Sequence, residues 1–242
     1  MTAYFDMHCH IIPDVDDGAK GLDMSMQILK TEYDGGIRNI ILTPHFRLGM
    51  FETPSDVILR QYDLLKEAAA GRYPDLTLYL GCEFHSTQDM IRFIDRHERY
   101  RMAGSRYLLL EFSGRHSGKD IRERTYQVIS HGLIPIIAHC ERYDPVADDL
   151  DFADELIEMG ALLQVNADSI LGYDGRHAKK FCKNLLKYDM VSFIGSDCHD
   201  LHERASHMGE CITFLEKKYG LEQTREILYD NPMRIIHDEM PR

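Results

Sequence analysis

Short runs of apolar residues alternate along the chain with longer segments in which apolar residues recur every third or fourth position. The short runs have the length of buried strands, and the longer spacing is typical of amphipathic helices. The predicted strands are Tyr4–Met7, Asn39–Thr43, Leu76–Leu80, Tyr107–Leu110, Leu133–Ala138, Ala161–Val165 and Val191–Ile194. The predicted helices are Leu22–Tyr33, Ser55–Ala69, Met90–His97, Ile121–Ser130, Phe152–Glu158, Arg176–Lys187, Glu203–Lys218 and Glu222–Tyr229.

Residues at the helix ends support these boundaries. Gly35 and Gly36 end the first helix, and Ser55 is the predicted N-cap of the second. Asn231 and Pro232 are expected to stop the last helix. Strand and helix in regular alternation indicate a parallel sheet. Seven such rounds predict an α/β fold, a (β/α)7 TIM-like distorted barrel, with a doubly wound open sheet as the alternative.

Polar residues follow almost every predicted strand. His8 and His10 close the first strand, and residues two apart in a strand point to the same side. Such a pair can also be buried and satisfied by hydrogen bonds, and a polar residue often closes a strand. The pattern recurs, however, in the loops and strand ends that carry Asp17, His45, Glu83, Glu111, His139, Asp197 and His199. Because barrel strands end on one face, we expect these side chains to converge there.

The predicted set combines five imidazoles with four carboxylates. Nine ligands exceed the roughly four to six that one ion takes from nitrogen and oxygen donors. The set therefore predicts two or three ions that share a bridging carboxylate, and Mn²⁺, Fe or Zn²⁺ suit these donors. Three divalent ions outweigh four carboxylates, so the filled pocket would be positive and would attract phosphate.

Composition narrows the class of protein. With 44% hydrophobic and 28% charged residues, the chain is typical of a globular domain, and we expect one domain over residues 1–242. The net charge of −12 argues against nucleic-acid binding, which needs a basic surface. We expect no signal peptide and no membrane span, and the six cysteines, which form no C-x-x-C pair, are expected to stay reduced in the cytoplasm.

Taken together, the polar phrases resemble the PHP (polymerase and histidinol phosphatase) superfamily. Within it, the chain is most similar to the manganese-dependent protein-tyrosine phosphatases of bacterial capsule and exopolysaccharide operons. The opening phrase H-x-H-x-x-P-x-x-D-D-G is particularly specific, because the wider superfamily shares only its first part. The matching phrases cover nearly the whole chain, at His8–Ala19, Thr43–His45, Gly81–Glu83, His139–Tyr143, Leu163–Ala167 and Ser196–His199.

The resemblance implies a site with three metal ions, usually manganese. One ion would be bound by His8, His10, Glu83 and Asp197, a second by Glu83, Glu111 and His139, and a third by Asp17, His45 and His199. Arg142 and Arg204 would grip the phosphate. The implied substrate is a phosphotyrosine protein, in particular a tyrosine autokinase that controls polysaccharide synthesis. The cysteines Cys9, Cys82, Cys140 and Cys198 are departures that remove no ligand.

The expected reaction is hydrolysis of phosphotyrosine by a metal-activated hydroxide. Arg142 and Arg204 offer planar, bidentate donors to the phosphate oxygens. Tyrosine, with a pKa of about 10, is a fairly good leaving group, and His199 or a metal-bound water could protonate it. The Asn166 amide is expected to have a structural role or to hydrogen-bond a metal ligand, with direct contact to the substrate as the alternative.

The loop after the second strand is a predicted substrate wall. Exposed Phe46 or Phe51 could stack on the phosphotyrosine ring, and Arg47 could bind acidic or phosphate groups. The alternative is that these aromatic rings pack beneath the loop. Of the remaining histidines, His85 and His116 are best placed to support ligands from behind.

Three other interpretations stay open. Cys198–Arg204 fits the C-x5-R phrase of cysteine-dependent tyrosine phosphatases, although its acidic filling would repel phosphate. The same metal site could hydrolyse a small molecule such as histidinol phosphate, since one fold hosts many substrates. A metal-loaded binding module without activity is the third, and the complete ligand set argues against it.

Overall fold

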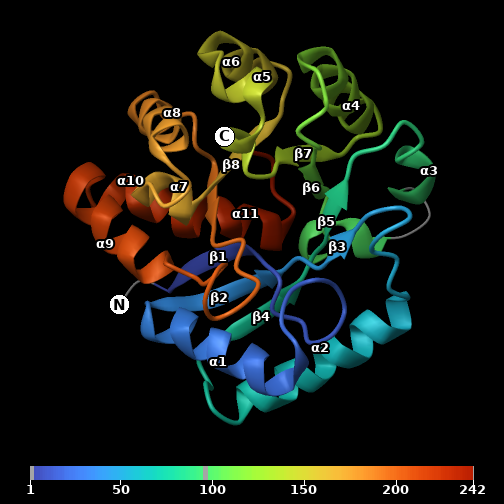
Figure 1. Ribbon diagram of the computed structural model, residues 1–242, viewed down its shortest axis with the longest axis vertical. Coiled ribbons are helices and arrows are strands. Elements are labelled where there is room, and N and C mark those ends of the chain that lie inside the picture. The colour runs from blue at the N-terminus through green and yellow to red at the C-terminus, as the bar shows by residue number, and fades with distance from the viewer. Residues whose placement is uncertain (1–2, 95–97, 242) are drawn as a thin grey trace.

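Parallel strands form the centre of the molecule and helices surround them (Figure 1). The computed structural model describes residues 3–94 and 98–241. Its strands are β1 (Tyr4–Cys9), β2 (Ile37–Leu42), β3 (His45–Phe46), β4 (Thr77–Leu80), β5 (Glu83–His85), β6 (Tyr107–Glu111), β7 (Ile134–Ile137), β8 (Leu162–Asn166) and β9 (Phe193–Gly195). The predicted strands Asn39–Thr43 and Leu76–Leu80 correspond to β2 and β4, and the short strands β3 and β5 follow them after a break, so that the nine strands occupy the seven predicted positions.

Pairing between neighbours closes these strands into a barrel. β1 pairs with β2 and β2 with β4, while β3 pairs with β5 and the series continues through β6, β7 and β8 to β9. Two backbone hydrogen bonds join the ends of β9 and β1. The His10 N–H donates to the Cys198 carbonyl at 2.9 Å, and the Asp197 N–H donates to the His8 carbonyl at 2.8 Å. The predicted seven-stranded barrel is confirmed, and the open sheet is wrong.

The register between β1 and β2 shifts in the second half of β1, between Asp6 and Cys9. Such a shift changes which side chains of the strand point into the barrel. Phe5 and Met7 lie in a buried apolar cluster together with Leu109 and Phe193. Cys9 belongs instead to the larger core that includes the residues of the surrounding helices. Apolar side chains therefore close the barrel below the polar strand ends.

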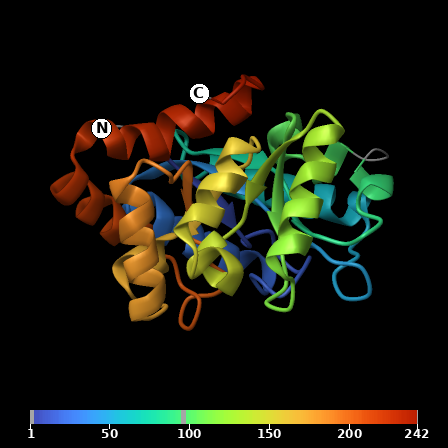
Figure 2. The same cartoon turned by 90° about the horizontal axis from the view of Figure 1, so that it is seen from above.

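The helices follow the strands in the predicted alternation. They are α1 (Gly21–Asp34), α2 (Ser55–Ala70), α3 (Ile91–Ile94), α4 (Gly118–Ser130), α5 (Asp144–Ala147), α6 (Leu150–Glu158), α7 (Ala167–Leu171), α8 (Arg176–Lys187), α9 (Met208–Tyr219), α10 (Leu221–Arg225) and α11 (Asn231–His237). No helix within the described ranges has the length and apolar character needed to cross a membrane. The last helices (red) lie along one side of the barrel, opposite the loops at the strand ends (Figure 2).

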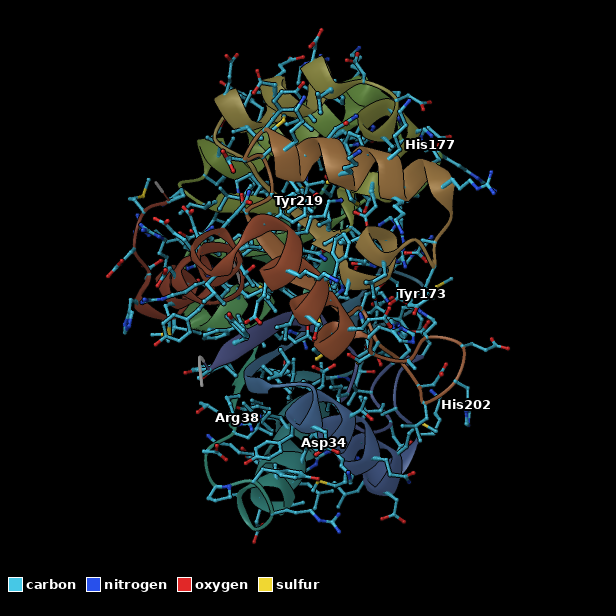
Figure 3. All side chains as sticks on the ribbon, turned by 90° about the vertical axis from the view of Figure 1, so that its left-hand side faces the viewer. Asp34, Arg38, Tyr173, His177, His202 and Tyr219 are labelled. Atoms are coloured by element: carbon cyan, nitrogen blue, oxygen red, sulfur yellow. The ribbon has the colours of Figure 1, made fainter. Side chains whose placement is uncertain are left out.

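Two helix starts differ from the prediction. Ser55 is the first residue of α2, and Pro54 occupies the N-cap position assigned to it. α9 begins well after Glu203, because the Asp200 side chain accepts hydrogen bonds from the backbone N–H groups of His202 and Arg204. These bonds fold the preceding segment into a loop, and Figure 3 shows His202 at its outer end.

The predicted helix stop at Asn231 and Pro232 is wrong. A π-helical turn, Glu226–Asp230, leads from α10 directly into α11. Pro232 lies in the first turn of α11 and follows the π-helical turn directly, so it does not end the helix. Of the predicted helix Met90–His97, α3 forms the central part, and residues 95–97 lie outside the described residues.

Candidate metal centre

A cavity of about 350 Å³ opens at the carboxyl ends of the strands. It is lined by both predicted arginines and by six of the nine predicted ligands, namely Asp17, His45, Glu83, Glu111, His139 and Asp197. Side chains separated by up to 187 positions, from Asp17 to Arg204, thus meet on one face, as the barrel geometry predicts.

The most buried ligand group consists of His8, His10, Glu83 and Asp197, whose donor atoms all lie within 4.8 Å of one another. The Nε2 atoms of His8 and His10 are 3.2 and 3.1 Å from Glu83 Oε2. The same two nitrogens are 3.7 and 3.5 Å from Asp197 Oδ1. This group has the same members as the first predicted ion site.

A second group brings His45 together with Glu83 and Glu111. His45 Nδ1 lies 3.0 Å from Glu83 Oε2, whereas His139, the predicted member, places its Nε2 2.7 Å from Glu83 Oε1. Glu83 therefore presents Oε2 to histidines of both groups and Oε1 to His139, and it is a member of both ligand groups.

The third group contains the predicted Asp17, His45 and His199, and adds His10. Asp17 Oδ1 is 3.4 Å from His45 Nε2 and 3.5 Å from His199 Nε2. His10 and His199 stack with their ring centroids 3.9 Å apart. All nine predicted ligands thus lie in one continuous cluster.

Two carboxylates of this cluster are held in their ionised form. Burial raises the pKa of Glu83, but the charges of His8 and His45 outweigh it and hold that pKa well below its usual value. Burial also opposes ionisation of Asp197, yet its hydrogen bond with His10 and the charge of His8 keep its pKa well below the usual value. Burial and the neighbouring His10 lower the pKa of His199 to about 4, so this ring is neutral near pH 7. Burial opposes a charge on His8 and His10, but the neighbouring carboxylates prevail and raise the pKa of both rings, so an ion bound there would displace their protons.

Two atoms of the predicted ligands are buried without a hydrogen-bond partner among the described residues: Glu111 Oε2 and His199 Nε2. Leaving such atoms unpaired costs free energy, so native proteins almost always satisfy them. Two unpaired lone-pair atoms, gathered in a set of nitrogen and oxygen ligands, fit divalent metal ions.

In four of the predicted ligand histidines, Nδ1 lies within hydrogen-bond distance of another group of the protein. Tyr143 Oη lies 3.1 Å from His139 Nδ1, and the backbone carbonyl of Asp197 lies 2.9 Å from His199 Nδ1. Gln164 and Asp16 do the same for His8 and His10, at 3.1 and 2.9 Å. Such contacts fix the orientation of each ring and would leave Nε2 free to hold a metal ion.

Sequence reasoning assigned no role to Asp16, Gln164 or Tyr143. Each lies inside a phrase that carried the resemblance, so its position was the available signal. Gly18 completes this region, since a Cβ atom there would lie 2.1 Å from the His10 carbonyl oxygen. Only glycine, which has no Cβ atom, allows the loop to pass so close to the predicted ligand His10.

Both predicted arginines contact Asp197 at the edge of the cavity. Arg142 Nη1 donates to Asp197 Oδ2, and Arg204 Nη2 donates to Oδ1 at 3.1 Å. Asn166 Nδ2 also donates to Oδ2, at 3.1 Å. The two guanidinium groups remain partly exposed, with 39% of each side chain accessible, so they can also meet a ligand in the cavity.

Two ligands occupy strained backbone. His139 has φ 31° and Asp197 has φ 53°, in the left-handed region that residues with a Cβ rarely adopt. Non-glycine residues held in this region concentrate at functional sites, where the surrounding structure maintains the strain.

The structure separates the residues of the predicted substrate loop. Phe46 is 7% exposed and packs against Phe84 and Tyr100 at centroid distances of 5.0 and 4.6 Å, so the expected exposure of Phe46 is wrong. Arg47 and Phe51 line the cavity. For His85 and His116, the described residues show no hydrogen bond to a predicted ligand.

The C-x5-R alternative conflicts with the position of its cysteine. Cys198 is fully buried and does not line the cavity. A hydrogen bond with Cys9 favours its thiolate, but burial and the charges of Glu32 and Asp6 prevail and raise the pKa of Cys198. A buried thiol with a raised pKa is a poor nucleophile.

Fold and cavity together define a parallel α/β barrel with a cluster of nitrogen and oxygen side-chain atoms that could hold metal ions. Solved barrels that share this fold include the phosphotriesterase homology protein from Escherichia coli, at 11% identity over 96% of this chain and 98% of that chain (TM-score 0.63). Another is histidinol phosphate phosphatase from Lactococcus lactis, at 15% identity over 90% of this chain and 94% of that chain (TM-score 0.58).

The chain belongs to the family described as capsular polysaccharide synthesis, CpsB/CapC, whose model matches residues 4–237. It is 35% identical to tyrosine-protein phosphatase CpsB of Streptococcus pneumoniae over 97% of this chain and 99% of that protein. The chain is also similar to a crystal structure described as that of YwqE from Bacillus subtilis and CpsB from Streptococcus pneumoniae, unique metal-dependent tyrosine phosphatases. The two chains are 27% identical and superpose with a TM-score of 0.88, over 98% of this chain and 96% of the other. The predicted family is confirmed, and the predicted enzyme class agrees with these names.

Proposed function

We propose that the chain is a metal-dependent protein-tyrosine phosphatase whose single catalytic domain spans residues 1–242. The observation that carries this proposal is the convergence of three ligand groups and two arginines in one cavity. The names of the relatives support phosphotyrosine as the substrate class.

Three ligand groups that share His10, His45 and Glu83 suit two or three ions. The donors are nitrogen and oxygen without thiolate, and we propose Mn²⁺, with Fe or Zn²⁺ as possible replacements. Ions held there would acidify a water molecule and neutralise charge on the phosphate.

We assign phosphate binding to Arg142 and Arg204. Their contacts with the two oxygens of Asp197 fix both guanidinium groups at the edge of the cavity. Planar, permanently charged donors match the phosphate oxygens, and their hydrogen bonds strengthen as negative charge grows during the reaction. Arg47, which lines the same cavity, is available for an acidic or phosphate group of the substrate.

We assign His199 to metal binding rather than to proton donation. Its Nδ1–H faces the Asp197 carbonyl oxygen at 2.9 Å, which leaves Nε2 as a lone pair directed at the ligand group. A neutral ring in this tautomer has no proton to give at Nε2.

The proposed substrate is a phosphorylated tyrosine autokinase that acts in capsule or exopolysaccharide synthesis, in line with the description of the family. We place the reaction in the cytoplasm, where the six free cysteines would stay reduced. Nucleic acid is an unsuitable partner for a chain of net charge −12.

The test is hydrolysis of a phosphotyrosine peptide after treatment with a chelator and again after addition of Mn²⁺, with Cys198→Ser alongside. We expect the chelator to abolish activity, Mn²⁺ to restore it and Cys198→Ser to stay active. Activity that ignores the chelator and disappears in Cys198→Ser would refute the metal mechanism. Hydrolysis of histidinol phosphate without hydrolysis of the peptide would keep the site and replace the substrate.

A further inference from the structure

The loop after β3 is a rigid hairpin beside the metal centre. The Arg47 N–H donates to the Phe51 carbonyl at 2.9 Å, and the Phe51 N–H donates to the Arg47 carbonyl at 2.8 Å. Gly49 forms the tip with φ 75°, and its N–H donates to Glu52 Oε1 at 2.6 Å. In Figure 2 this hairpin (light blue) projects on the same side as the loop that carries Arg204 (orange).

Two apolar side chains of the hairpin line the cavity of the metal centre. Phe51 lies nearly parallel to the ring of His45, with centroids 5.0 Å apart and an interplanar angle of 11°. Met50 is 60% exposed, although it borders the cavity. Leu48, at the tip, is also exposed but does not line the cavity. Met50 and Phe51 together therefore give this side of the cavity an apolar surface that a ligand in the cavity can contact.

Further aromatic surface lines the same cavity. Phe112 and Tyr143 contribute to it and pack edge to face, with centroids 5.6 Å apart. The Tyr143 hydroxyl is occupied, because it accepts the Phe112 N–H at 2.9 Å and contacts His139. The cavity therefore combines charged groups for a phosphate with aromatic and thioether surface for a ring.

We propose that the hairpin is an aryl subsite, in which Phe51 and Met50 hold the phenyl ring of the substrate and make the enzyme prefer aryl over alkyl phosphate monoesters. This inference rests on the proposed phosphatase function. A flat ring offers stacking and edge contacts to Phe51 and sulfur contacts to Met50, and a serine side chain offers neither. Because hydrogen bonds hold the hairpin in place, little ordering is needed when the ring binds.

The test compares one peptide that carries either phosphotyrosine or phosphoserine, hydrolysed by the Mn²⁺-loaded full chain. Phe51→Leu should lower the ratio of kcat/KM for phosphotyrosine to that for phosphoserine by roughly 3- to 10-fold, mainly through KM, as expected for one aromatic contact. Met50→Ala should also lower this ratio. Phe51→Trp, which keeps an aromatic ring at the position, should leave the ratio close to that of the wild type. Leu48→Ala is the matched control and should leave both activities unchanged.

Inhibition constants give a readout without turnover. Phenylphosphonate should bind more tightly than methylphosphonate, and Phe51→Leu should narrow this difference while metal content stays constant. An unchanged ratio in both Phe51→Leu and Met50→Ala would overturn the aryl subsite. An equal loss on both substrates together with lost metal would also overturn it, since Phe51 would then only position His45. A wild-type protein without activity on either peptide would instead overturn the proposed function itself.

Discussion

Gln164 offers the most direct test of how the ligands are held. Its side chain is fully buried, and its Oε1 lies 2.7 Å from the His139 backbone N–H and 3.1 Å from His8 Nδ1. Its Nε2 donates to the Val165 carbonyl and to Asn166 Oδ1, both at 2.9 Å. One amide thus orients two metal ligands at once.

Gln164→Met keeps the volume and removes these hydrogen bonds. The His139 N–H and His8 Nδ1–H would be left buried without an acceptor, at a cost of about 1–3 kcal/mol each. A total loss of about 3 kcal/mol lowers the Tm of a chain of this size by roughly 6–12 °C. Loss of the contact behind His8 should also weaken metal binding by roughly 10- to 100-fold.

The assay combines urea unfolding of the metal-free protein with titration of Mn²⁺. Thr125→Val is the matched control, because Thr125 is also fully buried but its Oγ1 has no hydrogen-bond partner in the described part of the chain, so stability and metal affinity should not fall. A Gln164→Met protein that binds Mn²⁺ like the wild type would refute the orienting role, even if its Tm falls. Unchanged stability would refute the free-energy argument as well.

The remaining predictions concern three single substitutions. His139→Ala should abolish most activity and leave the circular dichroism spectrum intact, and a folded variant with near-normal activity would contradict the assignment of His139. Cys198→Ser should keep Mn²⁺-dependent activity on a phosphotyrosine peptide, because the thiol lies outside the cavity. Glu32→Gln should stabilise the protein increasingly as the pH rises above about 4.5, as measured by urea unfolding at pH 4 and pH 8. Burial and the nearby Asp6 raise the pKa of Glu32 well above its usual value. The folded state therefore holds a proton that the unfolded state releases, and wild-type stability falls with pH over that range. An equal effect of Glu32→Gln at both pH values would contradict this linkage.

The strand and helix pattern was largely readable from the sequence, because apolar spacing is a local property. The seven strands were placed correctly to within a few residues, whereas the start of α9 and the end of α10 were not. The loop before α9 depends on a side chain of Asp200 that folds back onto the backbone, and the continuation into α11 depends on a π-helical turn. Neither leaves a signature in hydropathy.

The sequence by itself determined which residues gather at the site. Parallel strands that close into a barrel must end on one face, so polar residues that follow the strands converge whatever their separation along the chain. Only the tertiary structure decided how they pair. His45 rather than His139 joins Glu83 and Glu111 in a ligand group, and His8 is oriented by Gln164, 156 positions away.

The substrate loop shows the same division. Phe46 and Phe51 are equivalent in the sequence, as aromatic residues of one short loop, and both were candidates for the substrate wall. In the hydrogen-bonded hairpin Phe51 stacks on His45 and lines the cavity, while Phe46 is buried against Phe84 and Tyr100. Which ring faces the cavity depends on packing against elements distant in the chain. That packing energy is a property of the folded barrel, and no local pattern encodes it.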